Sequence, residues 1–317
     1  MIQTTNLPIL RPAVADQVNR GMVYMIVAML LLPVGDTFAK LLSDTMSPAG
    51  VTLWRILAQG VFLFPVAWLL RHRLEGAMFS PVVALSGGLL AISLSALIAA
   101  FAVMPIATAI AIFFVEPLIL TILAAILLGE TIGRRRLIAV AVGLLGALIV
   151  IRPGFAAYGW ATALPLTSAV AYALNMIVMK IATRTRSGLT VQCGATVYAA
   201  LVMIAIAVGL NGAGMDGLVP DLRDVGSFAM ILCAGAVAAI TFVLIASAYR
   251  TNDAAGLAPF QYLEIVMATA LGFLVFGDFP DALTWWGLAI ILGSGIYIFR
   301  REAHADTSAP RRRRGGR

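Results

Sequence analysis

Long apolar runs separated by short polar loops constrain the fold of this chain more than any other feature. The runs are about 20 residues each, and at ~1.5 Å per residue a helix of that length crosses a hydrocarbon core of ~30 Å. The strands of a membrane barrel are about half as long and alternate in polarity. We therefore predict an all-α integral membrane protein with ten transmembrane helices. They span 21–42, 50–70, 78–103, 106–128, 135–151, 158–181, 190–209, 226–249, 254–276 and 283–300.

Composition excludes an ordinary soluble domain. Hydrophobic residues make up 61% of the 317 positions and charged residues 12%, against roughly 45–50% and about 25% in soluble proteins. Residues 1–20 hold two prolines and two arginines but no apolar core. We interpret them as a cytoplasmic tail and not as a cleavable signal peptide. Residues 302–317 form a second, basic tail.

The sequence repeats itself, with an acid at the centre of each copy. Glu116 and Glu264 are each the eleventh residue of their predicted helix, and their spacing of 148 residues also carries Gly129-Glu130 onto Gly277-Asp278. With five helices in each copy, the two copies cross the membrane in opposite directions. Carriers built from inverted repeats hold their substrate near the midplane, where the repeats meet. The predicted repeats are 21–152 and 153–301.

The distribution of lysine and arginine predicts the orientation. Cytoplasmic loops hold the excess of these residues, and with the amino terminus inside, only Arg152 and Arg223 fall in outer loops. We therefore expect an inner-membrane protein with both termini in the cytoplasm. The run Arg311–Arg314 has the charge to contact anionic lipid or nucleic acid. A topology anchor is the simpler interpretation, and we expect no nucleic-acid partner.

At this point the chain resembles a known family. Two five-helix copies, with Gly129-Glu130-Thr131 closing the fourth helix before a glycine-rich fifth, resemble the EamA family of the drug/metabolite transporter superfamily. The second copy carries the matching runs 257–264, 276–281 and 293–297. The family usually closes the ninth helix with glycine and glutamate, and this chain has Gly277-Asp278, an acid shorter by one carbon. The resemblance covers residues 21–301.

That resemblance implies secondary active transport of a small molecule across the lipid bilayer, with no nucleotide site and no cofactor. Family members carry amino acids, flavin, S-adenosylmethionine, sugars and other metabolites in either direction. A flavin such as riboflavin, or an amino-acid-like compound, is the substrate that we favour from aromatic content and mixed charge. Proton coupling and homodimer formation stay open at this point.

Glu116 and Glu264 are the first candidates for binding a substrate or a proton. A charged side chain at the centre of a membrane helix costs about 2.5–3.5 kcal/mol on insertion scales, so such residues usually face the bundle interior or a water-filled cavity. The same cost favours the neutral form of the acid, which suits a proton-coupled carrier. The alternative is that each acid is permanently hydrogen-bonded and only joins two helices.

Other polar residues are predicted at a similar depth. Asp36 has Lys40 one helical turn away, and an i, i+4 pair can satisfy itself on one helix face. Arg55 is the better candidate for contact with a substrate, because its forked guanidinium suits a carboxylate or phosphate. In the second copy the neutral residues Asn175 and Tyr172 take the corresponding place. The two copies are thus expected to match in shape but not in charge.

Aromatic and amide side chains accompany the two acids. Phe113 precedes Glu116 by three positions, as Gln261 precedes Glu264, so each is expected to share a helix face with its acid. Tyr262 lies beside Gln261. Flat rings at these positions would suit a planar heterocycle, although aromatic residues in membranes more often face lipid or the core. Pro117 and Pro259 are expected to kink their helices near the cavity.

Other classes of function have weaker support. The motifs of metalloproteases, serine hydrolases and nucleotide-binding loops are missing from the sequence, so we do not predict an enzyme. A channel or a non-transporting membrane scaffold remains the alternative to a carrier, since fold alone does not define function. Cys193 and Cys233 fall at different depths of the predicted bundle, which argues against a disulfide.

Overall fold

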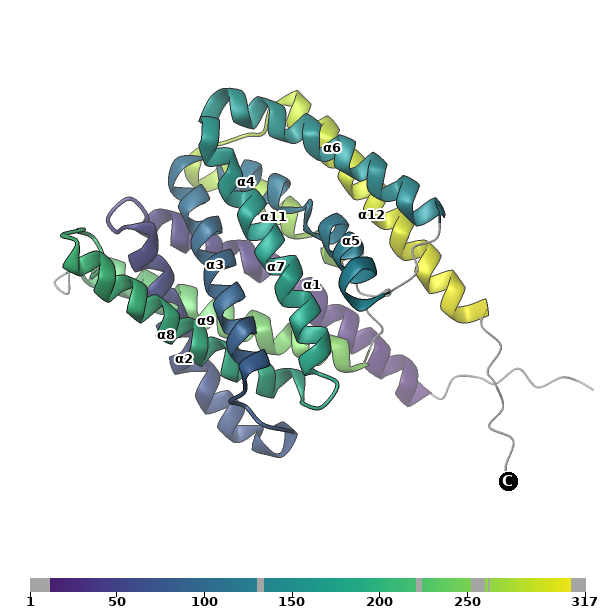
Figure 1. Cartoon of the computed structure of the whole chain (residues 1–317), viewed down its shortest axis with the longest axis horizontal. Helices are drawn as coiled ribbons and strands as arrows, with labels where there is room; N and C mark the ends of the chain where they lie inside the picture. Colours follow the sequence, from purple (N-terminus) through teal and green to yellow (C-terminus); the bar gives the residue numbers. More distant parts are fainter. Residues whose placement is uncertain (1–11, 130–133, 221–223, 252–259, 262, 309–317) are drawn as a thin grey trace, which may run out of the picture.

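Helices make up all of the regular secondary structure in the described part of the chain (Figure 1). The structure, a computed structural model, describes residues 12–129, 134–220, 224–251, 260–261 and 263–308. The α-helices are α1 (Pro12–Leu42), α2 (Pro48–Leu69), α3 (Pro81–Val103), α4 (Ile106–Phe113), α5 (Glu116–Leu128), α6 (Arg134–Tyr158), α7 (Ala163–Ala182), α8 (Gly188–Gly212), α9 (Val225–Thr251), α11 (Leu263–Phe276) and α12 (Ala282–Ser308). Two short 3₁₀ helices, η1 (Arg71–Arg73) and η2 (Gly159–Thr162), complete the set.

Seven segments within the described ranges are long and apolar enough to cross a membrane. They are Arg20–Leu42, Pro48–Leu69, Pro81–Val103, Ile106–Leu128, Phe155–Ala182, Gly188–Gly212 and Val225–Ala248. Three shorter apolar segments lie at Ile138–Ile149, Leu263–Phe276 and Ala282–Ser294. The protein is therefore a multi-pass, all-helical membrane protein, as the sequence predicted.

Several helix boundaries differ from the predicted ones. The first helix begins at Pro12, well before the predicted start at residue 21, and α12 continues to Ser308. The fifth predicted helix ends at Tyr158 instead of residue 151, so Arg152 lies within α6 and not in a loop. The predicted helix at 254–276 is described at 260–261 and from Leu263 onward.

The fourth predicted span, 106–128, is confirmed in its bounds, but its helix is interrupted at Phe114 and Val115. Helix α4 ends at Phe113 and α5 begins at Glu116. Pro117 explains the break, because it has no N–H and its ring crowds the carbonyl four residues earlier, which belongs to Phe113. Glu116 therefore lies in the first turn of a half-helix and not in the middle of a continuous one.

Helix contacts form matching sets when the first five predicted spans are compared with the last five. Helix α1 packs against α9 as α7 packs against α3, and α2 packs against α9 as α8 packs against α3. The α5–α7 contact is matched by the α11–α1 contact. Helices α6 and α12 pack against each other along one side of the bundle (Figure 1). This pattern is consistent with a two-repeat architecture.

Two glycines make these matching crossings close. A Cβ atom at Gly87 of α3 would lie 2.5 Å from the Cβ of Tyr198 in α8, and a Cβ at Gly235 of α9 would meet Ala58 in α2 and lie 2.7 Å from the backbone nitrogen of Gln59. Gly87 and Gly235 are 148 residues apart, the same spacing that separates the two glutamates. Small residues allow membrane helices to approach this closely.

We expect Gly235→Ala to destabilise the bundle. The added methyl has no free space at the α2–α9 crossing, and overpacking of this kind costs about 1–3 kcal/mol. Thermal unfolding of the purified protein in detergent measures the effect. Gly209→Ala is the matched control, because a Cβ at that helical glycine meets nothing within 4 Å. Equal unfolding temperatures for the two variants would contradict the packing assigned to Gly235.

Two glycines of α6 lie at its close contact with α12. A Cβ at Gly143 would lie 2.5 Å from the Ser294 hydroxyl oxygen, and one at Gly146 would lie 2.9 Å from the Gly287 carbonyl oxygen. Gly293 is different, because a Cβ there would meet nothing within 4 Å. Gly143 and Gly146 therefore allow the close packing of α6 on α12, and Gly293 does not contribute to it.

Candidate functional site

A buried ion pair joins the first two helices. The Arg55 guanidinium donates through Nη1 to Oδ1 of Asp36 over 2.9 Å, and both side chains are at most 8% exposed. Oδ2 of Asp36 and Nε of Arg55 are buried without a hydrogen-bond partner in the described part of the protein. Unsatisfied polar atoms at this depth are costly in free energy. They are the atoms that a ligand or a water molecule would satisfy.

The nearest part of α1 to the free end of the guanidinium is Gly35. A Cβ at position 35 would lie 3.5 Å from Nη2 of Arg55 and 3.4 Å from Val237 of α9. The guanidinium therefore lies against the backbone of α1 near its contact with α9. Sequence analysis did not identify Gly35, although a glycine directly before a buried acid is a usable signal of close approach.

The alternative pairing of Asp36 with Lys40 is wrong. Lys40 extends instead to the end of α11, where its Nζ lies 3.1 Å from Oδ2 of Asp278. The same ammonium donates to the Met104 carbonyl over 3.2 Å and lies 4.6 Å from the centre of the Phe276 ring. The two ion pairs are thus separate, one inside the bundle and one at the end where α1 terminates.

Glu116 is buried at the break between α4 and α5. Its side chain is only 8% exposed, and its Oε1 has no hydrogen-bond partner among the residues that the structure describes. The residue lies in the first turn of α5, where the N–H groups of Leu118 and Ile119 both donate to the Val115 carbonyl. Half-helix starts of this type are where membrane carriers place ligand-binding groups.

Glu264 occupies the equivalent place in the second half. It is the second residue of α11 and is buried. Helix α11 packs against α1, which carries Asp36, and against α4, which ends three residues before Glu116. The three acids from α1, α5 and α11 therefore lie on neighbouring elements, and we call them the acid cluster, with Arg55 attached through Asp36.

The polar residues predicted in the second half form a neutral counterpart. Asn175 is buried, and its Oδ1 accepts a 2.6 Å hydrogen bond from the Ser86 hydroxyl. Ser93 and Ser168 form a second hydroxyl contact at the same α3–α7 crossing, 3.0 Å apart. Sequence analysis missed these serines. The buried Asn175, which needs a partner on a neighbouring helix, was the available signal.

Aromatic residues are grouped differently from the prediction. The Phe113 ring contacts Tyr172 edge to face with centroids 5.7 Å apart. Phe113 ends α4 and Glu116 begins α5, so the side shared by these two residues stays a prediction. Gln261 is half-buried in a helical segment, and Tyr262 lies outside the described residues, so its predicted role stays a prediction.

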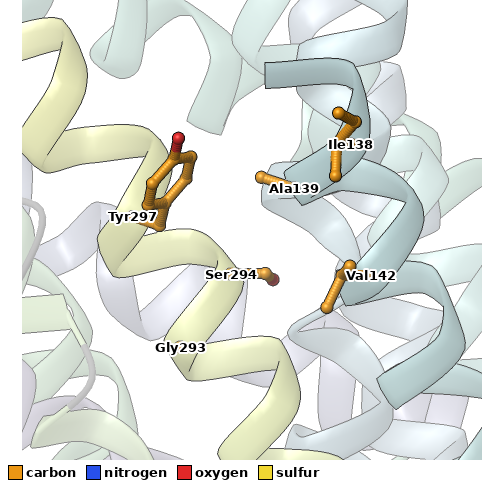
Figure 2. Close-up of a pocket in the computed structure, with 6 residues that line it drawn as sticks. All are labelled: Ile138, Ala139, Val142, Gly293, Ser294 and Tyr297. Atoms are coloured by element: carbon orange, nitrogen blue, oxygen red, sulfur yellow. The ribbon is translucent and has the colours of Figure 1, made fainter. Parts of the chain in front are cut away.

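A cavity of about 300 Å³ lies elsewhere, between α6 and α12. Figure 2 shows its lining, with Ser294 and Tyr297 on α12 opposite three side chains of α6. The full set is Ile138, Ala139, Val142, Gly293, Ser294 and Tyr297. None of the predicted site residues lines it, so this cavity is separate from the buried acids.

Metal binding has no support in the described residues, where no group of three or more His, Cys, Asp or Glu side chains is placed to hold an ion. Both cysteines are free, with Cys193 buried and Cys233 exposed. This confirms the prediction that they form no disulfide with each other.

A multi-pass helical bundle with acids and a guanidinium buried among apolar helices defines a membrane transporter, since ionisable residues in such positions mark substrate and ion pathways. The chain belongs to the EamA-like transporter family, whose model matches residues 19–152 and 159–300. This confirms the family resemblance found in the sequence.

Relatives with known functions are transporters of different compounds. A riboflavin transporter of Rhizobium johnstonii is 32% identical over 69% of this chain and 70% of its own length. An S-adenosylmethionine uptake transporter of Rickettsia prowazekii is 22% identical over 91% of this chain and 95% of its own. A pseudopaline exporter of Pseudomonas aeruginosa is 26% identical over 91% of this chain and 99% of its own length.

A solved crystal structure has a similar fold. It aligns with a TM-score of 0.62 at 19% identity and covers 90% of this chain and 98% of that chain. At this level of identity the likeness concerns the fold alone.

Proposed function

We propose that this protein is a secondary carrier that moves a small metabolite across the inner membrane by alternating access. The observation that carries the proposal is the cluster of Asp36, Glu116 and Glu264 buried between α1, α5 and α11. Such acids are expensive to bury in a membrane and are normally functional. A non-transporting scaffold would not need them, and a channel would need a continuous polar pore.

The proposed architecture is ten spans in two inverted repeats. The three shorter apolar helices would complete the seven longer ones, with repeats at 21–152 and 153–301. The matching helix contacts support this arrangement, as do the two glycine crossings. The start of α1 and the end of α12 lie at the same end of the bundle (Figure 1), which supports the proposal that both termini are cytoplasmic.

Within this proposal the residues have distinct roles. Glu116 and Glu264 take up a proton or bind a donor group of the substrate, because each is a buried acid at the start of a helix. Arg55 and Asp36 offer one unsatisfied donor and one unsatisfied acceptor. Asn175 and Tyr172, in the second half of the chain, provide neutral hydrogen-bonding groups. Proton coupling follows because an acid that alternates between water and a dry interior changes its charge state.

Riboflavin is the first candidate substrate and an amino-acid-like compound the second. The Phe113–Tyr172 ring pair supports a planar heterocycle, since aromatic rings prefer offset or edge-to-face contacts with one another. The name of the Rhizobium relative supports the same choice. The Asp36–Arg55 pair supports a zwitterion, and the name of the Rickettsia relative, an S-adenosylmethionine transporter, agrees with that alternative.

Uptake into proteoliposomes tests the proposal. The purified protein is given an imposed pH gradient and a panel of riboflavin, several amino acids and S-adenosylmethionine. We expect one compound to accumulate saturably against its concentration gradient and to be released when a protonophore collapses the pH gradient. Flux that never exceeds equilibration would contradict a carrier, and accumulation that ignores the pH gradient would contradict proton coupling.

A further inference from the structure

One ammonium group holds together three elements at the end of the bundle where α1 terminates. Lys40 lies in the last turn of α1 and contacts the carboxylate of Asp278 and the carbonyl of Met104, the residue that caps α3. It also lies over the ring of Phe276, the last residue of α11. Helices α1 and α3 belong to the first half of the chain and α11 to the second. The contact therefore spans both halves.

The backbone after α11 fixes the position of Asp278. Gly277 has a φ of +73°, and the Asp278 N–H donates to the Gly272 carbonyl over 3.0 Å while the Gly277 N–H donates to the Phe273 carbonyl. The bond from the Gly277 N–H to the carbonyl four residues earlier is the αL motif, which ends a helix with a left-handed glycine. Because a side chain at residue 277 would oppose that φ, the acid is held at a defined point over the end of α11.

The exposure of this pair differs from that of the Asp36–Arg55 pair. The Lys40 and Asp278 side chains are 16% and 31% exposed, whereas Arg55 and Asp36 are 8% and 2% exposed. Ion pairs that water reaches contribute little net free energy, so the Lys40–Asp278 pair can break and re-form readily. Breaking a buried pair is far more costly. Only the Lys40–Asp278 contact is therefore suited to opening in every cycle.

The position of Lys40 links this contact to the buried acids. Lys40 follows Asp36 by four residues on α1, which places it one helical turn nearer the helix end on the same face. Separation of Lys40 from Asp278 frees the ends of α1 and α11, the two helices that carry Asp36 and Glu264. Because α1 and α11 pack against each other, their separation at this end would expose the acid cluster.

We propose that Lys40 and Asp278 form the gate that closes this end of the transport path, which is the outer end in the proposed orientation. This inference rests on the proposed carrier function. The ammonium closes the path by joining α1, α3 and α11, and the path opens when the Lys40–Asp278 contact breaks and α11 separates from α1.

Cysteine accessibility tests the gate without knowledge of the substrate. Thr37 is buried on α1, three residues before Lys40, and Thr37→Cys is introduced after Cys193→Ala and Cys233→Ala remove the native thiols. A membrane-impermeant maleimide is added to right-side-out vesicles. We expect Lys40→Met and Asp278→Asn each to speed labelling by about fivefold, which corresponds to a loss of about 1 kcal/mol from the closed state, the upper end for an ion pair that water reaches.

Two further variants serve as controls: one exchanges the two charges of the pair, and the other removes an acid outside the pair. The double variant Lys40→Asp with Asp278→Lys restores a pair of opposite charges, and we expect its labelling rate to return toward the parent value. Asp216→Asn removes an exposed acid from the α8–α9 loop and is expected to leave labelling unchanged. Unchanged labelling in both single variants, or no recovery in the exchanged pair, would overturn the gate.

The labelling result and the transport result separate the two proposals. If labelling responds as expected while no compound on the panel accumulates, the gate stands and the proposed transport activity fails. If a compound accumulates at the parental rate in Lys40→Met and labelling does not change, the carrier stands and the gate is wrong.

Discussion

Replacing Glu264 with glutamine is expected to lower substrate accumulation driven by a pH gradient by about a hundredfold or more. The amide is the same size but cannot take up and release a proton, and removal of a proton-transferring group typically costs 10²–10⁴-fold in rate. Glu116→Gln is expected to act alike, because Glu116 is the equivalent acid at the start of the other half-helix. Initial uptake rates and accumulation ratios in proteoliposomes give the measurement.

An exposed acid is the matched control for these two variants. Glu75 lies in the loop between α2 and α3 and is exposed, so Glu75→Gln removes the same charge without touching the cluster. We expect it to transport at the parental rate. If Glu116→Gln and Glu264→Gln also keep the parental rate and pH profile, the assigned role of the two acids is wrong.

Arg55→Met is expected to lower the free energy of unfolding by about 3–5 kcal/mol, the cost of leaving one member of a buried ion pair uncompensated. Methionine fills much of the same volume, so loss of packing contributes little. Asp36, which is 2% exposed, would then be buried without its cation. Thermal and denaturant unfolding of the purified protein in detergent, followed by tryptophan fluorescence, gives the measurement.

The double variant Asp36→Leu with Arg55→Met separates stability from function. Replacement of a whole buried pair by apolar residues is often neutral or stabilising, so we expect the double variant to regain parental stability. If its transport remains lost while stability returns, the pair serves the substrate or the coupling proton. If both single variants unfold like the parent, the ion pair does not form in solution.

The class of the fold could be predicted from the sequence because the signals for it are local. Apolar length identified the helices, and the spacing of Glu116 and Glu264 identified equivalent positions in the two halves. Contacts between residues far apart in the chain were not accessible in this way. Asp278 had been noted for its place in the repeat and Lys40 as a possible partner of Asp36, but 238 residues separate the two, and only the packed bundle joins them.

The break at Phe113 shows how a local rule can give the right place and the wrong outcome. Pro117 was expected to kink a continuous helix, and instead two helices result. A proline removes one hydrogen bond and crowds one carbonyl, and whether the helix bends or ends depends on which neighbours satisfy the freed groups. Those neighbours come from other helices. The pairing of Asp36 with Arg55 instead of Lys40 likewise depends on a contact between helices.

The two halves of the bundle have matching crossings but different polar contents, with Asp36–Arg55 in one and the neutral Asn175–Ser86 contact near the other. In the proposed carrier, the inward-facing and outward-facing conformations differ by an exchange of roles between the two halves. These conformations would have equal energies only if the halves were identical. We therefore expect the empty protein to rest mainly on one side of the cycle. A membrane voltage contributes about 2.3 kcal/mol per elementary charge per 100 mV. A voltage can therefore change which side of the membrane the empty site faces.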